Sequence, residues 1–363
     1  MTIPRRQFLH NSLGTAATVA AAMALHPHSS LGAEDRKRIR VGQLGTAIGG
    51  HAGATMETLR KLSDDYEVVG VVVEPDGGTS SHRAFNDVPR LTEEQLFNTP
   101  GLQLVAVEGA VDTLFPGAAR AVAAGKHVHI EKPGSIAHGI FETLLRDADE
   151  RKLIVQVGYF LRHHPALQFL YQAVREGWLG KIFEIHGVMS KVIPSADRPA
   201  FAAERRVPMF ELGCYLIDTT VGMMQRPDKV TPFSRRTRGP SDDFIDNQVA
   251  VLEYPECTAT IRATFVDING FDRRQIVVCG EEGQIEIRPL ETSPRIRLTL
   301  TKPHGDYPAG TRSFSPGSPK GRLDDYFRDL ARTIRGEQET PFNNLHNLSV
   351  HEALVQASDL PRE

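Results

Sequence analysis

The 363-residue sequence predicts an α/β fold with two parts, and three observations support this prediction. Over the first 155 residues, short runs of aliphatic and β-branched residues alternate with helix-like segments, which is typical of βαβ units and a parallel sheet. A glycine-bearing turn follows the first of these runs. Beyond residue 155 the runs alternate apolar and polar residues, as in 258–263, which favours a sheet with one buried and one polar face.

The composition excludes several classes of protein. Hydrophobic residues make up 40% and charged residues 24%, which is ordinary for a globular protein. A net charge of −3 provides no overall basic field, so we expect no nucleic-acid partner. Cys214, Cys257 and Cys279 have no CxxC spacing, which indicates neither a disulfide framework nor a zinc site. His163 and His164 are adjacent without a third ligand at useful spacing, so we expect no metal and a role in ligand contact or helix capping.

Residues 1–33 differ from the rest of the chain and predict an export signal. They carry Arg5 and Arg6 but no acidic residue, followed by an alanine-rich apolar run at 13–25 and a loose tail. This order is typical of an export signal, and the apolar run is too short for a stable membrane span. An uncleaved N-terminal helix with a chance arginine pair is the alternative.

The arginine pair predicts the export route. Residues 5–6 with Phe8 and Leu9 are similar to the twin-arginine pattern, although Pro4 stands where Ser or Thr is usual. Twin-arginine export moves folded proteins, which suggests a cofactor acquired before export. We therefore expect a periplasmic or otherwise exported protein that holds its cofactor tightly.

A dinucleotide site is predicted where the first strand meets the first helix. The run 39–44 predicts the strand and residues 52–62 predict the helix. The turn between them starts with the candidate cofactor-binding residues Gly45, Thr46, Ala47 and Ile48. Glycine allows the backbone to approach a pyrophosphate that the helix N-terminus stabilises. The pattern departs from G-x-G-x-x-G, because Ala47 replaces the middle glycine and the loop is one residue shorter.

Glu74 predicts which nicotinamide cofactor is bound. It directly follows the second apolar run, 66–73, and lies 29 residues after Gly45. A carboxylate there accepts hydrogen bonds from both ribose hydroxyls and repels a 2′-phosphate, which favours NAD over NADP. Further strands are expected at residues 102–107 and 127–130, and helices at about 91–98 and 116–124.

The segment 124–133, AGKHVHIEKP, carries a family resemblance. Together with 158–165, 177–182, 212–218 and a helical tail at 324–358, it resembles the glucose–fructose oxidoreductase/inositol dehydrogenase (Gfo/Idh/MocA) family over nearly all of the chain after the leader. The resemblance implies a Rossmann domain over 37–155 and, over 156–363, a substrate-binding α/β domain with a large, mostly antiparallel open sheet and C-terminal helices. It also implies a homo-oligomer, a dimer or tetramer, formed through the exposed face of that sheet.

The residues after 155 agree with such a sheet. Strand-like runs lie at 182–192, 249–254, 259–266, 275–279, 284–288 and 296–301. Residues 313–321 are rich in Ser, Pro and Gly and predict a loop.

Lys132 is the principal catalytic candidate. It follows a predicted strand at the carboxyl edge of the parallel sheet, where open α/β folds bind ligands. Pro133 restrains its backbone, and the resemblance implies that this lysine contacts the substrate hydroxyl near the nicotinamide. A solvated surface lysine is the alternative. Glu131 and Lys132 are also candidate cofactor-binding residues, and Glu131 would support the loop or the cofactor, with a purely structural role as its alternative.

Tyr215 and Asp218 lie three residues apart on one face of a predicted helix over 213–224, and both are catalytic candidates. Many relatives have a histidine where Tyr215 stands or four residues after the aspartate, but here the second position is Gly222. Tyr215 is therefore expected to exchange the substrate proton beside Lys132, or else to pack in the pocket wall. Asp218 would orient a base or bind a sugar hydroxyl, unless it is an ordinary helix acid.

Arg162 and Lys191 are the candidate substrate-binding residues, each with a structural role as its alternative. The sequence thus predicts an NAD-dependent oxidoreductase acting on a small-molecule sugar, polyol or carbohydrate derivative. A redox-assisted lyase, epimerase or glycosidase is one alternative. A non-catalytic sugar- or nucleotide-binding relative is the other, because Ala47 and the missing histidine depart from the family pattern.

Overall fold

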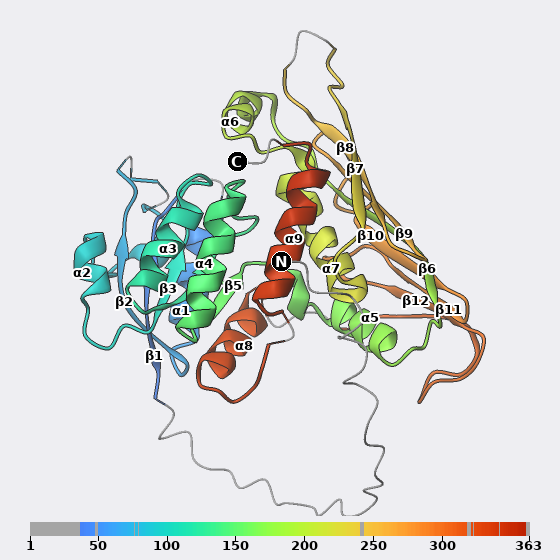
Figure 1. Cartoon of the computed structure of the whole chain (residues 1–363), viewed down its shortest axis with the longest axis horizontal. Coiled ribbons are helices and arrows are strands. Elements are labelled where there is room, and N and C mark those ends of the chain that lie inside the picture. Colours follow the sequence, from blue (N-terminus) through green and yellow to red (C-terminus); the bar gives the residue numbers. More distant parts are fainter. Residues whose placement is uncertain are drawn as a thin grey trace, which may run out of the picture. The chain divides into compact units, whose positions relative to one another are not determined.

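The computed structural model describes residues 37–47, 50–75, 77–78, 80–239, 243–317, 321, 323–340 and 342–360, all within one compact unit that spans 37–363. The leader at 1–33 and Ile48 lie outside the described residues, so the export signal and the cofactor role of Ile48 stay predictions. The predicted fold class is confirmed, because the chain forms one parallel sheet and one large, mostly antiparallel sheet (Figure 1). Among the described residues, no helix combines the length and apolar character that a bilayer crossing requires.

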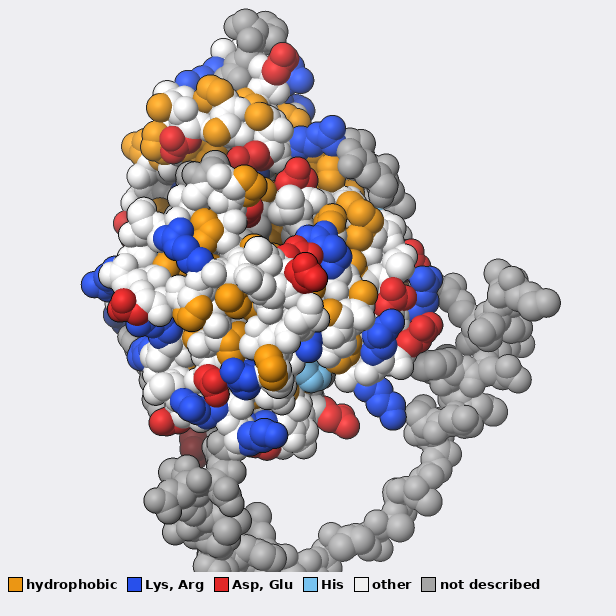
Figure 2. Space-filling model, turned by 90° about the vertical axis from the view of Figure 1, so that its left-hand side faces the viewer, with side chains coloured by type: hydrophobic (Ala, Val, Ile, Leu, Met, Phe, Trp, Pro, Cys, Tyr) orange, Lys and Arg blue, Asp and Glu red, His pale blue; other side chains and the backbone are white. Residues whose placement is uncertain are grey.

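The parallel sheet has five strands in the order β2-β1-β3-β4-β5. The strands are β1 (Ile39–Leu44), β2 (Tyr66–Val72), β3 (Leu104–Val107), β4 (His127–Ile130) and β5 (Val155–Val157). The helices along this part are α1 (Ala52–Lys61), η1 (Arg83–Phe85), α2 (Glu93–Phe97), α3 (Leu114–Ala123) and α4 (His138–Glu150). Strands β3 and β4 are buried along almost their whole length, which explains the continuous apolar run of β3. On the outer face of this part, acidic and basic side chains are interspersed (Figure 2).

The second sheet has eight strands in the order β13-β12-β11-β10-β6-β9-β8-β7, and only the central β6–β9 pair is parallel. The strands are β6 (Ile182–Ser190), β7 (Lys229–Arg235), β8 (Asn247–Glu253), β9 (Thr258–Thr264), β10 (Gln275–Gly280), β11 (Gly283–Ile287), β12 (Ile296–Leu300) and β13 (Gly310–Phe314). The sequence predicted six of them. It missed β7 and β13, the two edge strands, because each contains few buried residues and lacks a clear apolar alternation. The loop predicted at 313–321 is corrected at its start, since β13 continues to Phe314.

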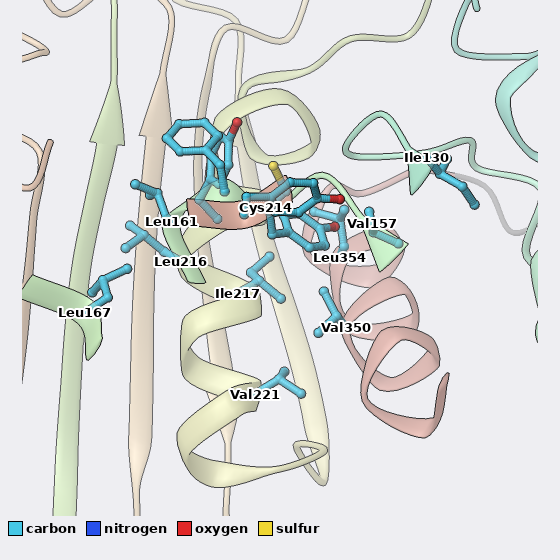
Figure 3. Packing of buried hydrophobic residues seen from close by; sticks show 14 of the residues in the cluster. Ile130, Val157, Leu161, Leu167, Cys214, Leu216, Ile217, Val221, Val350 and Leu354 are labelled. Carbon is cyan, nitrogen blue, oxygen red and sulfur yellow. The ribbon is translucent and has the colours of Figure 1, made fainter. Parts of the chain in front are cut away.

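Helices gather on one face of this sheet (Figure 1). They are η2 (Phe160–His163), α5 (Pro165–Arg175), a π-helical turn η4 (Met209–Gly213) that continues into α7 (Cys214–Met224), and α9 (Asn344–Ala357). In Figure 3, Leu216 of α7 points toward the sheet, whereas Ile217 and Val221 lie between α7 and α9. Helix α7 is therefore buried on both sides from Cys214 to Val221, which fixes the position of the preceding turn η4.

The C-terminal helices also hold the parallel-sheet part. In α8 (Asp324–Ile334), the backbone oxygen of Phe327 accepts a 2.6 Å hydrogen bond from the Tyr66 hydroxyl, and Asp324 pairs with Lys61 at 2.6 Å. The helical tail predicted at 324–358 consists of two helices, α8 and α9. The remaining short elements are η3 (Ser195–Asp197) and α6 (Arg198–Ala203), which precede η4.

Candidate active site

A cavity of about 730 Å³ opens at the carboxyl edge of the parallel sheet. One wall consists of the segments that follow β1 to β4, namely Ala47 and Gly50, Glu74 and Pro75, Gly109 to Val111, and Glu131 to Pro133. The opposite wall comes from η3, α6 and η4, through Asp197, Ala200, Phe201, Glu204, Arg206 and Glu211. The predicted edge of the sheet therefore faces residues from the second part of the chain, which the sequence did not place there.

The turn after β1 needs a glycine for a steric reason. Gly45 has φ +98°, and a Cβ at this position would lie 2.6 Å from the backbone nitrogen of Gly109. Any other residue would clash with the segment after β3 and adopt a left-handed backbone. The neighbouring Thr46 hydroxyl accepts a 3.2 Å hydrogen bond from the Glu74 backbone N–H. The candidate cofactor residues Gly45, Thr46, Ala47 and Glu74 are thus brought together, and Ala47 and Glu74 line the cavity.

Glu131 is held by a histidine that the sequence did not single out. Its Oε1 lies 2.7 Å from Nδ1 of His51, the residue that precedes α1. Burial raises the pKa of Glu131, but the neighbouring His51, Lys132 and His129 outweigh burial and leave the pKa lowered. Glu131 is therefore a charged anchor between the β4 end and the start of α1.

Lys132 follows β4, which lies three strands along the sheet from β2, the strand that precedes Glu74, and its side chain contacts η4. Its Nζ donates to the backbone oxygen of Glu211 at 3.2 Å and to Oε1 of the same residue at 3.4 Å. Burial alone lowers the pKa of Lys132, but the Glu211 carboxylate, together with Cys214 and Glu131, outweighs burial, and the pKa is raised. Lys132 is therefore an ammonium at neutral pH, able to donate a hydrogen bond to an oxygen in the cavity.

Glu211 is bound from both sides by cations. Arg206 donates from Nε to Oε2 at 3.2 Å and from Nη2 to Oε1 at 3.0 Å. Burial raises the pKa of Glu211, but Lys132 and Arg206 outweigh burial and lower it to about 2. Sequence reasoning missed both Glu211 and Arg206. One signal was available, since Glu211 lies four residues before Tyr215 and one helical turn brings such residues to one face.

Tyr215 lies beside Lys132. The lysine Nζ is 5.5 Å from the centre of the Tyr215 ring. Edge-on contacts with Phe160 and Tyr159, at ring-centre distances of 5.1 and 6.1 Å, fix the orientation of the tyrosine ring. Lys132, Glu211 and Tyr215 thus form one cluster between β4 and the η4–α7 helix.

Asp218 and Arg162 lie in a different environment, away from the cavity wall. Arg162 donates to Asp218 from Nη2 at 2.7 Å and from Nε at 3.0 Å, and both side chains are 2% exposed. His346 of α9 adds a contact to the same carboxylate at 2.9 Å, and Asn347 accepts from Arg162 at 3.0 Å. Burial raises the pKa of Asp218, but Arg162 and His346 outweigh burial and lower it. The pair joins η2, α7 and α9, which is the arrangement of a structural ion pair.

Lys191 follows β6 and is half-buried beside the cavity. Its Nζ lies 5.6 Å from the ring centre of Phe201, a residue of the cavity wall, and 5.8 Å from that of Phe265. Burial lowers the pKa of Lys191. The predicted substrate-binding pair is thus divided, with Lys191 near the cavity and Arg162 in the buried ion pair.

One buried cluster has potential metal ligands. Glu108, His129 and Glu131 offer ligand atoms within 4.8 Å of one another. These side chains already make hydrogen bonds with other protein groups. His129 contacts Glu108 at 3.1 Å and the Tyr326 hydroxyl at 2.6 Å, and Glu131 contacts His51.

Of the adjacent histidines, His164 has the helix-capping role that the sequence offered: it caps α5, accepting a hydrogen bond from the Ala166 N–H at 3.3 Å.

The second part of the chain matches a known domain family. Residues 167–286 match the family model described as the GFO/IDH/MocA C-terminal domain. This GFO/IDH/MocA region contains Lys191, Arg206, Glu211 and Tyr215, so the cavity wall opposite the parallel sheet lies within it.

The chain is also similar to oxidoreductases over most of its length. It is 26% identical over 350 residues to the scyllo-inositol 2-dehydrogenase (NADP(+)) IolW of Bacillus subtilis, covering 90% of this chain and 94% of that relative. The aldose-aldose oxidoreductase of Caulobacter crescentus has a TM-score of 0.72 at 19% identity, over 89% of this chain and 98% of that one. An oxidoreductase from Agrobacterium radiobacter, in complex with NAD+, L-tartaric acid and magnesium, has a TM-score of 0.73 at 14% identity, over 89% and 96% of the two chains.

Proposed function

We propose that the whole chain is a GFO/IDH/MocA oxidoreductase that transfers a hydride between NAD and a sugar, polyol or carbohydrate derivative. The observation that carries this proposal is the cluster of Lys132, Glu211 and Tyr215 beside a cavity that Glu74 also lines. A protonated lysine held beside a tyrosine is suited to acid–base work at a substrate oxygen.

The residues of the cavity fit a dinucleotide. A volume of about 730 Å³ at the carboxyl ends of parallel strands is suited in size and place to a bound cofactor. Ala47 and Gly50, close to the start of α1, would hold the diphosphate, and Glu74 at the end of β2 would accept hydrogen bonds from the adenosine ribose. We infer NAD rather than NADP, because a 2′-phosphate would be repelled by the Glu74 carboxylate.

The nicotinamide ring of such a cofactor accepts or donates the hydride. Lys132 would donate a hydrogen bond from Nζ to the substrate oxygen and stabilise the negative charge that develops there. Glu211 keeps Lys132 charged and in place, through its backbone and side-chain oxygens. Tyr215 would exchange the substrate proton at its hydroxyl. Asp218 and Arg162 would act as positioning residues, because their ion pair holds α7 against η2 and α9.

The cofactor and the reaction are tested in two steps. The purified protein is denatured, the released nucleotide is identified by mass, and the folded protein is titrated with NAD and NADP. Released or tightly bound NAD is expected. If neither nucleotide is released or bound, the enzyme proposal is wrong and a non-catalytic sugar-binding role takes its place. Incubation with a sugar panel, with the absorbance of NADH and the product masses followed together, then separates net oxidation from redox-neutral lyase, epimerase or glycosidase chemistry.

Export and assembly complete the proposal. We propose that residues 1–33 direct the folded protein through the twin-arginine route, and that NAD travels inside it. Replacing Arg5 and Arg6 by lysine should retain the protein in the cytoplasm, as cell fractionation would measure.

We also propose a homo-oligomer that forms through the open face of the eight-stranded sheet, and light scattering should detect a dimer or a tetramer. A monomer would contradict this assembly.

A further inference from the structure

We propose that the substrate carries an anionic group, a carboxylate or a phosphate, and that Lys191 and Arg206, which both lie beside the Phe201 ring, bind this group. The inference rests on the proposed function, because it names the substrate class of the same cavity. Three independent features carry it: the position of the Lys191 ammonium, the balance of charge around it, and the geometry of Arg206.

The Lys191 ammonium has no anionic partner in the part of the chain that the structure describes. The backbone of Lys191 is fixed by a 3.0 Å hydrogen bond from its N–H to the Thr264 oxygen. The structure gives its Nζ no hydrogen bond or ion pair among those described residues, and places it over the rings of Phe201 and Phe265. A half-buried ammonium between two aromatic rings has lost much of its hydration, and an anion arriving beside it would restore a strong interaction.

The charges that face Lys191 leave a local excess of cations. Lys132, Arg206 and Arg274 are the neighbouring cations, and Glu211 is the neighbouring carboxylate. Both oxygens of Glu211 are occupied by Arg206 and Lys132, and Arg274 pairs with Glu291. Glu211 therefore compensates two cations at once, and the charge of Lys191 remains to be balanced by a ligand.

Arg206 places a second cation on the same part of the wall. Its guanidinium carbon lies 4.2 Å from the Phe201 ring centre, and both residues line the cavity. Its Nη1 lies 3.4 Å from Glu204, whose side chain is 49% exposed, so this ion pair is weakened by solvent. The guanidinium and the Lys191 ammonium thus both contact Phe201, and an anionic group at this ring would be within the field of both.

The other described carboxylates that line the cavity do not form ion pairs with Lys191. Glu131 is paired with His51, and Glu74 follows β2 at the ribose end. Asp197 is exposed on η3 at the rim. The cavity as a whole is therefore not cationic, and the prediction concerns the region around Phe201, where the cations gather.

Calorimetric titration with matched pairs of ligands tests the inference without requiring turnover. The pairs share a carbon skeleton and differ in charge: gluconate and glucitol, galactonate and galactitol, glucuronate and glucose, and glucose 6-phosphate and glucose. Each is titrated into the full-length protein with and without saturating NAD. At least one anionic member should bind about tenfold more tightly than its neutral partner, the effect of one charge-assisted hydrogen bond. The carboxylate and phosphate pairs distinguish the two sources of the anion.

Variants assign the preference to Lys191. In Lys191→Met the anionic preference should fall to within about twofold, whereas Lys191→Arg should retain most of it. Lys181→Met is the matched control, since Lys181 is an exposed lysine paired with Glu256 at the surface, and it should leave the preference unchanged. Circular dichroism and thermal unfolding establish that each variant is folded.

The outcomes separate the inference from the function. The inference is overturned if no anionic ligand is preferred in any pair, or if the preference survives in folded Lys191→Met. The proposed function is judged by a different signal, the absorbance of NADH at 340 nm. Neutral sugars that reduce NAD while anionic ligands are not preferred would refute the substrate class and leave the oxidoreductase standing. A preferred anionic ligand that never reduces NAD would support the anionic substrate class and contradict the proposed oxidoreductase function.

Discussion

Replacing Glu211 by glutamine should destabilise the protein in a pH-dependent manner. The substitution keeps the size of the side chain and removes the charge that lies between Lys132 and Arg206. Both cations would then face a neutral amide in a buried site, where loss of one partner of an ion pair is costly.

The pKa of Glu211 sets the magnitude. The ordinary value of 4.5 falls to about 2 in the folded protein, and each unit is about 1.4 kcal/mol. Because the folded pKa is the lower one, the charged carboxylate stabilises the folded state at every pH above about 5. This contribution is lost as the pH falls from 4.5 toward 2. Glu211→Gln should therefore cost about 3 kcal/mol at pH 7 and less than half of that at pH 3.

Urea unfolding of both proteins at a series of pH values measures the difference. Glu204→Gln is the control, because Glu204 contacts the same arginine from an exposed position and its removal should change the unfolding free energy by less than about 1 kcal/mol. A Glu211→Gln cost that is independent of pH, or no larger than that of the control, would refute the assignment of Glu211 as the buried counter-charge of the cluster.

Three further predictions concern the ion pair, the cofactor and the catalytic lysine. Asp218→Asn should cost about 3–5 kcal/mol in urea unfolding, because Arg162 would be left buried without its carboxylate, and a loss below about 1 kcal/mol would contradict a structural pair. Glu74→Ser should raise the affinity for NADP relative to NAD by about tenfold or more, measured by fluorescence titration of the reduced cofactors, and an unchanged ratio would remove Glu74 from the ribose site. Lys132→Met should retain NAD and lower kcat by about 100-fold or more on whichever substrate the panel identifies, whereas retained turnover would exclude Lys132 from acid–base work.

The parts of the site that the sequence predicted are those tied to strand ends. Glu74 and Lys132 each lie two residues after the end of a strand, β2 and β4 respectively. The carboxyl ends of parallel strands lie at one edge of the sheet, so the two residues line the same cavity. The turn at Gly45 was predicted for the same reason, because a strand, a glycine and a helix are local signals. The edge strands β7 and β13 were missed because burial, and with it the apolar alternation, is weak at the rim of a sheet.

Charge partners were predicted less well. The sequence left Asp218 and Arg162 between a role at the site and a structural role, and it did not predict that these residues, 56 positions apart, are paired with each other and joined by His346 from α9. The sequence did not single out Glu211, and only the structure shows that it contacts Lys132, 79 positions away. Nothing in the local pattern distinguishes an exposed acid from one that is buried between two cations.

The sequence alone thus determined the fold class and predicted the edge of the sheet at which the cavity opens. Hydrophobic periodicity and turn chemistry act over a few residues, and they can be recognised without knowing what the segment contacts. The tertiary structure decided which carboxylate keeps Lys132 charged, that Arg162 and Asp218 are paired with each other, and which lysine near the cavity has no anionic partner among the described residues. Pairing depends on distances between segments remote in the chain, and burial makes each such pair strong, so these roles are set only when the segments pack together.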